Sequence, residues 1–402
     1  MEHGTAADGE FDFAALIHPF SAGKFFAEHW ERQPLLQRRG DENYYRRLLA
    51  IGDLEGFISR GDVRYPAIRL AKGGAFFPSE AYTQDVRYGD EVFRGLIDVE
   101  KVVTEYTSGA TVTLPALHRS LPALGRLCAQ MEALLDHSVH TNAYLTPPCA
   151  AGFTPHYDTH EVFVLQIAGR KHWRVYPPPL PLPHRSQPFS PQNYTLPPAA
   201  LLEFQLCPGD LLYLPRGHVH TTTTAEQFSA HVTIGVTVYT GVELLSELIH
   251  AAVDEPALRA SLPVGFAHPS ESRALEQQLA ALIGMLTGSA DATALTERFV
   301  HRVRAARARS GARFQADPAT IGPRSILQLA AGVDHRVLNA GGELILEIGG
   351  RRVHLQRAVE PVLEALCRGT PITPAALPAA ISLDARLSLV RYLHGLGFLQ
   401  LL

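Results

Sequence analysis

A chain of 402 residues is long enough for two or three domains and for a substantial hydrophobic core. Hydrophobic residues make up 46% of it and charged residues 19%, which is typical of a globular protein and excludes a disordered one. The net charge of −4 argues against a general binder of nucleic acid or membrane surfaces, so any basic contact surface has to be local.

The cysteines and the first residues indicate the cellular compartment. Cys128, Cys149, Cys207 and Cys367 are widely scattered with no CxxC pair, which fits neither a disulfide framework nor a zinc cluster. The opening MEHGTAADGEFDF lacks the basic and apolar segments of a signal peptide, and no stretch approaches about 18 uninterrupted apolar residues. We therefore expect a soluble, cytoplasmic protein with no membrane partner.

Residues 1 to about 60 are expected to form helices and turns, with one helix beginning at the N-cap candidate Ser21 and ending near Pro34. From about 64 to 240 the pattern changes to short β-rich runs such as EVFVLQIAG and KHWRVYP, separated by glycine and proline. This pattern predicts an antiparallel all-β unit. Residues 177–198 are too rich in proline for helix or sheet, so we expect a long extended surface loop there.

From Val242 the apolar spacing in VELLSELIHAAV and SRALEQQLAALIGMLTG predicts helices. They are too few to bury a core of their own, so they either pack on the β unit or pair with a second copy of the chain. After about residue 320 we expect a helix near SILQLA, a strand pair in ELILEIGGRRVHLQ turning at Gly349-Gly350, and helices in AVEPVLEALCRG and LDARLSLVRYLHGLGFLQLL. Helices with a small hairpin suggest a winged-helix-like module.

A metal-binding pattern lies at the start of one predicted strand. His156 and Asp158 are two residues apart, and in an extended chain such residues project to the same side, about 6–7 Å apart along the strand. The two side chains can therefore coordinate the same metal ion. Taken alone, a His-x-Asp triplet is common, and a polar surface turn is the alternative.

A second and more specific pattern lies downstream in CPGDLLYLPRGHVH. Gly209, Pro215, Gly217 and His220 match the second cupin motif, G(x)5PxG(x)2H. Pro215 and Gly217 favour a turn between two barrel strands, after which His220 points into the barrel. The two patterns together supply two imidazoles and one carboxylate from separated strands.

This donor set matches the 2-His-1-carboxylate facial triad, which leaves adjacent coordination positions open and is typical of non-haem Fe(II) oxygenases. A structural zinc site would close the shell with four protein ligands, usually including cysteine. Other histidines lie near the two motifs. His218 competes with the third ligand, although the motif spacing favours His220; we interpret His160 as a turn residue, His172 as an outward-facing strand residue, and His231 as a packed or supporting histidine.

A 2-oxoglutarate bound at such a centre needs a buried cation for its distal carboxylate. Lys171, on the strand after the His-x-Asp strand, is the best candidate, and a solvated lysine beside Gly169 is the alternative. Asn142 and Tyr144 share one strand face and Thr233 lies on another strand, so their polar groups could hydrogen-bond the co-substrate. The alternative is that they are ordinary strand residues.

The run NAYLTPPCAAGFTPHYDTHEVFVLQIAGRKHWRVYP followed by GDLLYLPRGHVH resembles the JmjC-type ribosomal oxygenases of the cupin superfamily. The opening FFAEHWERQPLL is similar to their N-terminal signature, an aromatic-rich helix ending in Trp-Glu-x-x-Pro-Leu. The resemblance implies a mainly β fold with α-helices. It consists of a double-stranded β-helix (JmjC/cupin) domain with N-terminal helices at 1–240, a helical dimerisation region at 241–318 and a C-terminal winged-helix-like domain at 319–402.

The resemblance further implies an Fe(II)- and 2-oxoglutarate-dependent dioxygenase that uses O2 to hydroxylate a protein side chain, either arginine or histidine of a ribosomal protein. Carried over position by position, it implies three iron ligands: His156, Asp158 and His220. It also implies a 2-oxoglutarate pocket made by Lys171, Asn142, Tyr144 and Thr233. The proline-rich segment 177–198 does not match the family's pattern, which leaves the substrate open.

Other functions remain open at this stage. The same chemistry could tailor a small peptide or demethylate a methylated side chain, and a metal-binding cupin regulator could use the winged module to bind nucleic acid. Arginines at 298, 302, 304, 307, 309 and 313 could form a nucleic-acid or ribosome-facing patch, or simply a solvated helix face. The resemblance implies that the helical region dimerises, so we expect a homodimer that acts on a protein substrate. The acidic net charge, and a last helix that offers only Arg386, Arg391 and His394 as contacts, lead us to expect no specific DNA binding.

Overall fold

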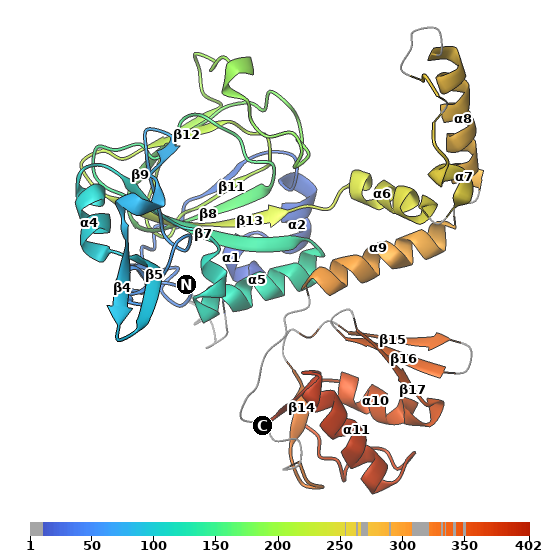
Figure 1. Cartoon of the computed structure of the whole chain (residues 1–402). Coiled ribbons are helices and arrows are strands. Elements are labelled where there is room, and N and C mark those ends of the chain that lie inside the picture. Colours follow the sequence, from blue (N-terminus) through green and yellow to red (C-terminus); the bar gives the residue numbers. More distant parts are fainter. Residues whose placement is uncertain are drawn as a thin grey trace. The chain divides into compact units, whose positions relative to one another are not determined.

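The computed structural model describes residues 11–253, 255–262, 264–266, 272–288, 291–307, 321–330, 333, 335–340, 343–348 and 351–402. The chain divides into two compact units, one ending at Val238 and the other beginning at Tyr239. Figure 1 shows the elements of both, and each unit is described by itself below.

The first unit begins with α1 (Phe13–Ile17), α2 (Ala22–Glu28), β1 (Leu35–Gln37) and α3 (Ile51–Ile58). The predicted N-cap is confirmed, because the Ser21 hydroxyl accepts a hydrogen bond from the backbone N–H of Lys24 at 3.3 Å. The helix nevertheless ends at Glu28, earlier than the predicted end near Pro34. The chain then turns and enters β1, which is paired with a strand about 175 residues further along.

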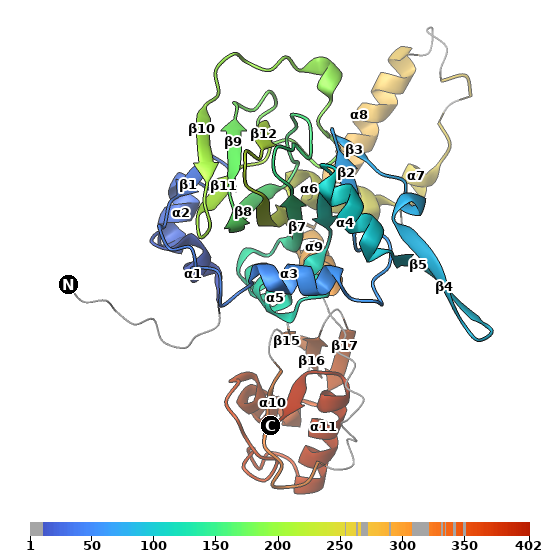
Figure 2. The same ribbon diagram turned by 90° about the vertical axis from the view of Figure 1, so that its left-hand side faces the viewer.

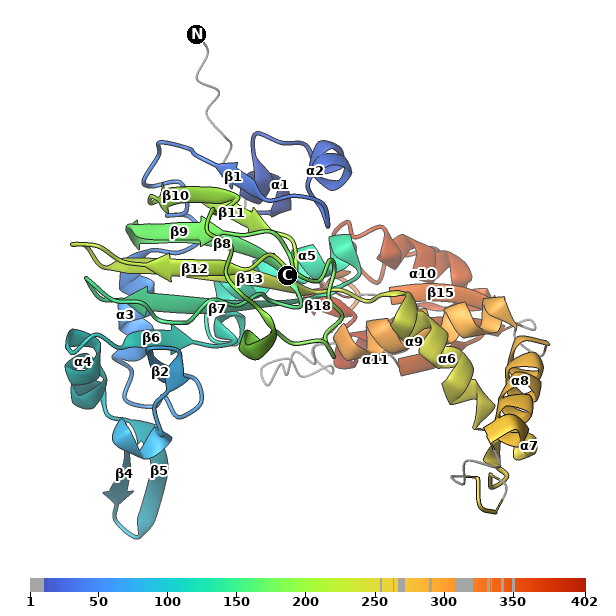
Figure 3. The ribbon, with the colours of Figure 1, turned by 90° about the horizontal axis from the view of Figure 1, so that it is seen from above.

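Two antiparallel sheets make up the centre of the first unit, with strand orders β1-β11-β8-β13-β7-β6-β2-β3 and β10-β9-β12. The further strands of the larger sheet are β2 (Arg69–Lys72), β3 (Ala75–Phe76), β6 (Thr111–Leu114), β7 (Ser138–Thr146), β8 (Glu161–Gly169), β11 (Leu211–Leu214) and β13 (Ser229–Thr237). The smaller sheet consists of β9 (Lys171–Val175), β10 (Leu202–Leu206) and β12 (His220–Thr223). Figure 3 shows the strands of both sheets from above.

Side chains of β8 alternate between two cores, as a strand buried on both faces requires. Phe163 and Leu165 pack with the N-terminal helices in the main core. Val162 and Val164 pack with Trp173 in a second core, to which both sheets contribute. Figure 2 shows α1 and α3 below the strands of the larger sheet.

The region from about 64 to 240 is not all-β as predicted, because it contains two helices, α4 (Val99–Thr107) and α5 (Pro122–Leu135). Both have recognisable starts. The Asp98 carboxylate accepts a hydrogen bond from the N–H of Lys101 at 3.3 Å, and Pro122 occupies the first turn of α5. Before α4 in the chain, β4 (Thr83–Tyr88) and β5 (Glu91–Ile97) form a separate two-stranded hairpin.

The proline-rich segment 177–198 has no strand or α-helix in its described residues, as predicted, and only a short 3-10 turn, η3 (Pro191–Asn193). Tyr157, which lies between the predicted ligands His156 and Asp158, holds this segment in place. The Tyr157 hydroxyl donates to the Gln187 carbonyl oxygen at 3.0 Å, and the ring lies 5.1 Å from Phe189. The loop therefore packs directly on the metal-binding motif.

The second unit starts with helices α6 (Gly241–Ala252), α7 (Pro256–Arg259), α8 (Ser272–Gly288) and α9 (Ala292–Arg307). In α6 the acidic side is buried, since Glu247 pairs with Arg302 of α9 at 2.7 Å. Its apolar residues Val242, Leu245 and Ile249 are exposed instead. Among the described residues, no single helix is long and apolar enough to span a bilayer. One bent pair of helices, Leu275–Gly288 with Ala292–Arg304, reaches that length and apolar content only when the two are taken together.

The remaining elements of the second unit are β14 (Leu327–Leu329), β15 (His335–Ala340), β16 (Glu343–Ile348), β17 (Arg351–Leu355), α10 (Glu360–Cys367), α11 (Leu383–Gly395) and β18 (Leu399–Leu401). The predicted helix near SILQLA is wrong, because those residues form β14, which pairs with β18 at the end of the predicted last helix. The hairpin of β16 with β17 is confirmed, although its glycine turn at 349–350 lies outside the described residues.

Candidate metal centre

The structure brings His156, Asp158 and His220 together, with one ligand atom from each lying within 4.8 Å of the others. The first two precede β8, and the third begins β12. Reciprocal backbone hydrogen bonds join the two histidines, from His220 N to the His156 oxygen at 2.9 Å and from His156 N to the His220 oxygen at 3.4 Å. The Gly217 N–H also donates to the Asp158 carbonyl oxygen at 3.0 Å. These bonds align the two motifs.

Both histidines of this group have their Nδ1 atoms engaged by backbone carbonyl oxygens. The His156 Nδ1 lies 2.8 Å from the Thr154 oxygen, and the His220 Nδ1 lies 3.2 Å from the His218 oxygen. A ring that donates through Nδ1 carries its lone pair on Nε2. The arrangement therefore presents two Nε2 donors to a shared ion, oriented by the backbone.

The electrostatics favour the protonation states that bind metals. Burial lowers the pKa of His220 to about 4, so its imidazole is neutral at neutral pH. Burial would raise the pKa of Asp158, but the nearby imidazoles of His160, His220 and His156 hold it below its usual value. A neutral imidazole and an ionised carboxylate are the forms that coordinate a divalent cation.

The competing histidines take other positions. His218 is buried with its Nδ1 3.1 Å from the Pro215 oxygen, and it is not part of the metal-binding group. His172 faces outward, as predicted, and its Nε2 lies 3.3 Å from the Glu203 carboxylate. His231 is buried and stacked 5.0 Å from Tyr144, as expected for a packed histidine.

Lys171 is 3% exposed, which rules out the alternative of a solvated lysine. Its Nζ donates to the Thr146 hydroxyl at 3.0 Å. Burial alone lowers the pKa of Lys171 to about 7, and no carboxylate of the described residues acts on it. A buried amine with one neutral partner is expensive unless an anion joins it, so this position fits a ligand carboxylate.

Asn142, Tyr144 and Thr233 lie together, because the pairing of β7 with β13 places Asn142 directly opposite Thr233. The Tyr144 phenol forms hydrogen bonds with the side chains of the other two. Burial and the charge of Asp158 raise the pKa of Tyr144 to about 12, so the phenol keeps its proton. The Asn142 amide oxygen accepts the Ala116 N–H at 3.1 Å, which fixes the side chain.

Two further buried polar atoms close to this group have no hydrogen-bond partner in the described part of the chain, Trp173 Nε1 and His231 Nδ1. The Trp173 ring lies 5.7 Å from His220 and 5.8 Å from His231. Buried donors and acceptors are almost always paired in native proteins, so unpaired ones indicate a polar ligand or water. The residues present therefore fit a metal ion with a small anionic co-ligand.

A buried charge network that motif reasoning missed supports the centre. Glu161 is fully buried, accepts a hydrogen bond from the Tyr213 hydroxyl, and pairs with Arg216 at 2.7 Å. Arg216 lies inside the second motif and also pairs with Glu31 of the Trp-Glu-x-x-Pro-Leu segment. Burial raises the pKa of Glu161. The signal was present as charged residues inside two motifs, but their partners are far away in sequence.

Motif reasoning also missed an imidazole pair next to Asp158. The rings of His140 and His160 are 4.9 Å apart, and the His160 Nε2 lies 4.0 Å from the Asp158 carboxylate. Burial, followed by the charges of His160 and His118, lowers the pKa of His140 to about 4. His160 is therefore more than the turn residue that the sequence suggested.

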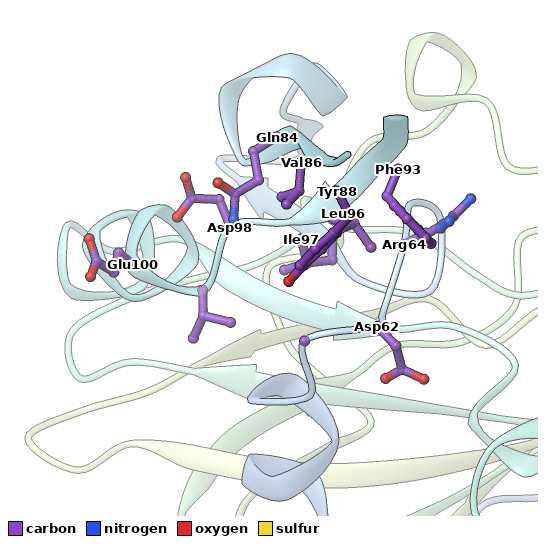
Figure 4. Close-up of a pocket in the computed structure, with 12 residues that line it drawn as sticks. Asp62, Arg64, Gln84, Val86, Tyr88, Phe93, Leu96, Ile97, Asp98 and Glu100 are labelled. Carbon is purple, nitrogen blue, oxygen red and sulfur yellow. The ribbon is translucent and has the colours of Figure 1, made fainter. Parts of the chain in front are cut away.

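The surface also carries a cavity of about 710 Å³ beside the β4–β5 hairpin. Figure 4 shows Asp62 and Arg64 on one side of it and Asp98 and Glu100 near the start of α4. None of the predicted site residues lines it. The predicted metal centre and this cavity are therefore separate features of the first unit.

Comparison with known proteins places this centre in context. Residues 116–244 match the JmjC domain family. Ribosomal oxygenase 2 of Bos taurus is 32% identical over 297 residues, covering 70% of this chain and 61% of that protein. Ribosomal oxygenase 1 of Gallus gallus is 35% identical over 226 residues, covering 55% of this chain and 36% of that protein. The bifunctional lysine-specific demethylase and histidyl-hydroxylase NO66 of Aedes aegypti is 31% identical over 243 residues, covering 59% and 37%.

Among solved structures, the Escherichia coli ribosomal oxygenase YcfD superposes with a TM-score of 0.51 at 18% identity, covering 95% of this chain and 98% of that one. A structure of YcfD with cobalt and 2-oxoglutarate gives a TM-score of 0.51 at 17% identity, covering 95% and 98%. These likenesses establish a shared fold. The chain spans about a third to three fifths of the length of the curated relatives named above.

Proposed function

Residues 116–244 are a JmjC domain homologous to those of the ribosomal oxygenases, and we propose from this premise that the chain is an Fe(II)- and 2-oxoglutarate-dependent oxygenase. Its reaction is the hydroxylation of a protein side chain. One observation carries the proposal: a His-Asp-His group stands in the same unit as a buried lysine on which no carboxylate of the described residues acts.

His156, Asp158 and His220 would hold the metal and leave adjacent positions for the co-substrate and O2. When bound, Fe(II) and 2-oxoglutarate supply the activation of O2 and the electrons needed to oxidise a carbon–hydrogen bond. Lys171, with the Thr146 hydroxyl beside it, would bind the distal carboxylate. The cobalt and 2-oxoglutarate named for YcfD support this choice of ligands.

Tyr144 would act as a hydrogen-bond donor in the pocket, oriented by Asn142 and Thr233. Because its phenol stays protonated, it can donate to an oxygen of the co-substrate or the target at any physiological pH. The buried walls around Trp173 and His231 exclude bulk water from the Lys171 end of the site. Exclusion of water strengthens each of these polar contacts.

The proposed target is a side chain of a ribosomal protein, as the names of the relatives suggest. The name of the Aedes aegypti relative specifies histidine, and arginine is the alternative that the sequence resemblance implies. To test it, the protein is incubated with Fe(II), 2-oxoglutarate and ribosomal proteins from a host that lacks the gene. Succinate formation together with the gain of one oxygen atom on one residue, seen by mass spectrometry, is the expected result. Absence of both products would refute the oxygenase.

A demethylase of the same chemistry is the second candidate, because the name of the Aedes aegypti relative includes lysine demethylation. The two outcomes differ in product. A demethylase releases formaldehyde and shortens a methylated side chain, whereas a hydroxylase retains the oxygen on the target. A peptide-tailoring enzyme would act on a small peptide and leave ribosomal proteins unchanged.

The helices of the second unit form a dimerisation region in this proposal. Leu245 and Ile249 of α6 and its C-cap residue Val253 follow one another at four-residue spacing, and each is at least 60% exposed. A helix that buries its acidic side and exposes its apolar side lacks a partner for the apolar side. A second copy of the chain, bound through this face, is the occupant we propose.

The elements from β14 to β18 form the winged-helix-like domain of this proposal, and specific DNA binding is not expected from it. The two arginines of α11 are engaged within the domain: Arg386 donates to the Leu377 oxygen at 2.6 Å and Arg391 to the Ile321 oxygen at 2.8 Å. His394 is buried. Contacts to bases or phosphates would require these side chains to leave their present partners.

A further inference from the structure

The side chains around the predicted metal ligands differ in exposure. Lys171 and His231 are at most 4% exposed. The Asp158 side chain, in contrast, is 32% exposed and that of His160 is 26% exposed. A macromolecular target therefore has to reach the metal from the side on which Asp158 and His160 lie.

The His140 and His160 rings flank that approach. They meet edge to face, with centroids 4.9 Å apart and planes 70° apart. The His140 ring occupies the space directly over Gly235, where a Cβ atom would lie 2.4 Å from its Cε1 and Nε2 atoms. β13 thus makes room for an imidazole beside the predicted ligand Asp158.

The pair offers hydrogen bonds but no negative charge. The His160 Nδ1 is buried and has no hydrogen-bond partner in the described part of the chain. Among the described groups whose charges act on His140, Asp158 is the only carboxylate, and the proposed metal would occupy it. A guanidinium or ammonium group placed here would lose its hydration without gaining an anion, next to a divalent cation.

We propose that His140 and His160 form the subsite for the target side chain, and that this subsite selects an uncharged, planar, hydrogen-bonding group of the imidazole or carboxamide class. This inference rests on the proposed oxygenase function. It states which half of the arginine-or-histidine alternative the residues beside the metal favour, and it extends the preference to asparagine-like side chains.

A binding experiment tests the selectivity without turnover. The protein is loaded with Zn(II) and 2-oxoglutarate, and saturation-transfer NMR compares the N-acetyl amides of histidine, asparagine, arginine and lysine. Binding of the histidine and asparagine compounds, lost in the His140→Leu/His160→Leu variant, is the expected result. Equal binding of the arginine compound, or unchanged binding of the asparagine compound in the variant, overturns the proposal.

The hydroxylation experiment supplies a second readout. Oxygen found on histidine or asparagine of a ribosomal protein supports the subsite, and oxygen on arginine or lysine refutes it. If the loaded protein binds 2-oxoglutarate and the NMR selectivity holds but nothing is hydroxylated, then the proposed function fails while the subsite stands.

Matched variants separate recognition from folding. His160→Leu and His160→Asn have nearly the same shape, but only asparagine can hydrogen-bond. On the identified target we expect leucine to lower kcat/KM by about 10-fold or more, through KM, and asparagine to restore part of it. His172→Leu, on the outward face of β9, is the control and should behave as wild type. Equal losses in the leucine and asparagine variants would show a packing role only.

Discussion

Lys171 is the residue from which the co-substrate pocket is most clearly argued, because among the described residues only the Thr146 hydroxyl compensates for the burial of its amine. We predict that Lys171→Ala raises the 2-oxoglutarate concentration needed for turnover by more than about 100-fold. Losing the partner of a buried carboxylate costs about 3–5 kcal/mol. Metal binding should persist, and Lys171→Arg should retain part of the function. Unchanged 2-oxoglutarate dependence in the alanine variant would move the anchoring role to another residue.

The lowered pKa of Lys171 also predicts a pH dependence of binding. In the ligand-free protein the pKa is about 7, and a bound carboxylate raises it because it favours the charged amine. Binding between these two values takes up a proton, so affinity for 2-oxoglutarate must fall as pH rises above about 7, by up to about tenfold per pH unit. Calorimetry on the Zn(II)-loaded protein measures this. Affinity that is flat between pH 7 and 9 would contradict it; Lys171→Arg, which stays charged, is the flat control.

The choice of His220 over His218 yields a comparison of two neighbouring positions. His220→Ala should lower metal affinity by at least about 100-fold, since even supporting partners of ligands cost 10–100-fold when removed. His218→Ala removes a side chain that bonds the Pro215 oxygen and should be much milder. Metal content measured after dialysis decides between them. A larger loss in His218→Ala would reverse the ligand assignment.

At the scale of elements, the first unit depends on contacts between segments that are distant in sequence. Arg216, in the turn before β12, joins Glu161 of β8 to Glu31 ahead of β1. We predict that Arg216→Met destabilises the fold by about 3–5 kcal/mol, because it leaves Glu161 buried and unpaired. Denaturant unfolding monitors the loss.

Two further variants test that explanation. Adding Glu161→Gln to Arg216→Met should restore part of the stability, because the remaining group is then neutral. Arg60→Ala, which removes an exposed ion pair with Asp62, is the matched control and should leave the unfolding transition nearly unchanged. A double variant as unstable as Arg216→Met would mean that packing, and not charge, dominates at this position.

At the scale of the whole molecule, the exposed apolar side of α6 predicts a homodimer of twice 43.9 kDa by light scattering. Leu245→Glu/Ile249→Glu should be monomeric, because charges on that side oppose its burial. His250→Glu, at an exposed polar position of the same helix, should remain dimeric. A wild-type protein that stays monomeric at micromolar concentration would leave the dimerisation region without support. The expected domain limits at 240/241 and 318/319 and the cytoplasmic location also stay predictions.

The local pattern of the chain was enough to predict that His156, Asp158 and His220 come together, and it predicted much of the β unit. His156 and Asp158 share one side of the chain through a two-residue period, and the PxGxxH spacing orients His220, so their approach follows from short-range geometry. Lys171 and His172 were assigned opposite faces by the same alternation. The helices α4 and α5 were missed although their caps are visible, because strand signals surround them.

Only the tertiary structure decided what depends on pairing between distant segments. β14 forms a strand because it pairs with β18, whose residues lie about 70 positions further along the chain, and no local period encodes that partner. His140 and His160 become a pair only when β7 is paired with β13, where Gly235 leaves room for the ring. Arg216 and Glu31 are 185 positions apart. Periodicity and turn spacing are properties of neighbouring residues, whereas these contacts arise from the register in which remote strands meet.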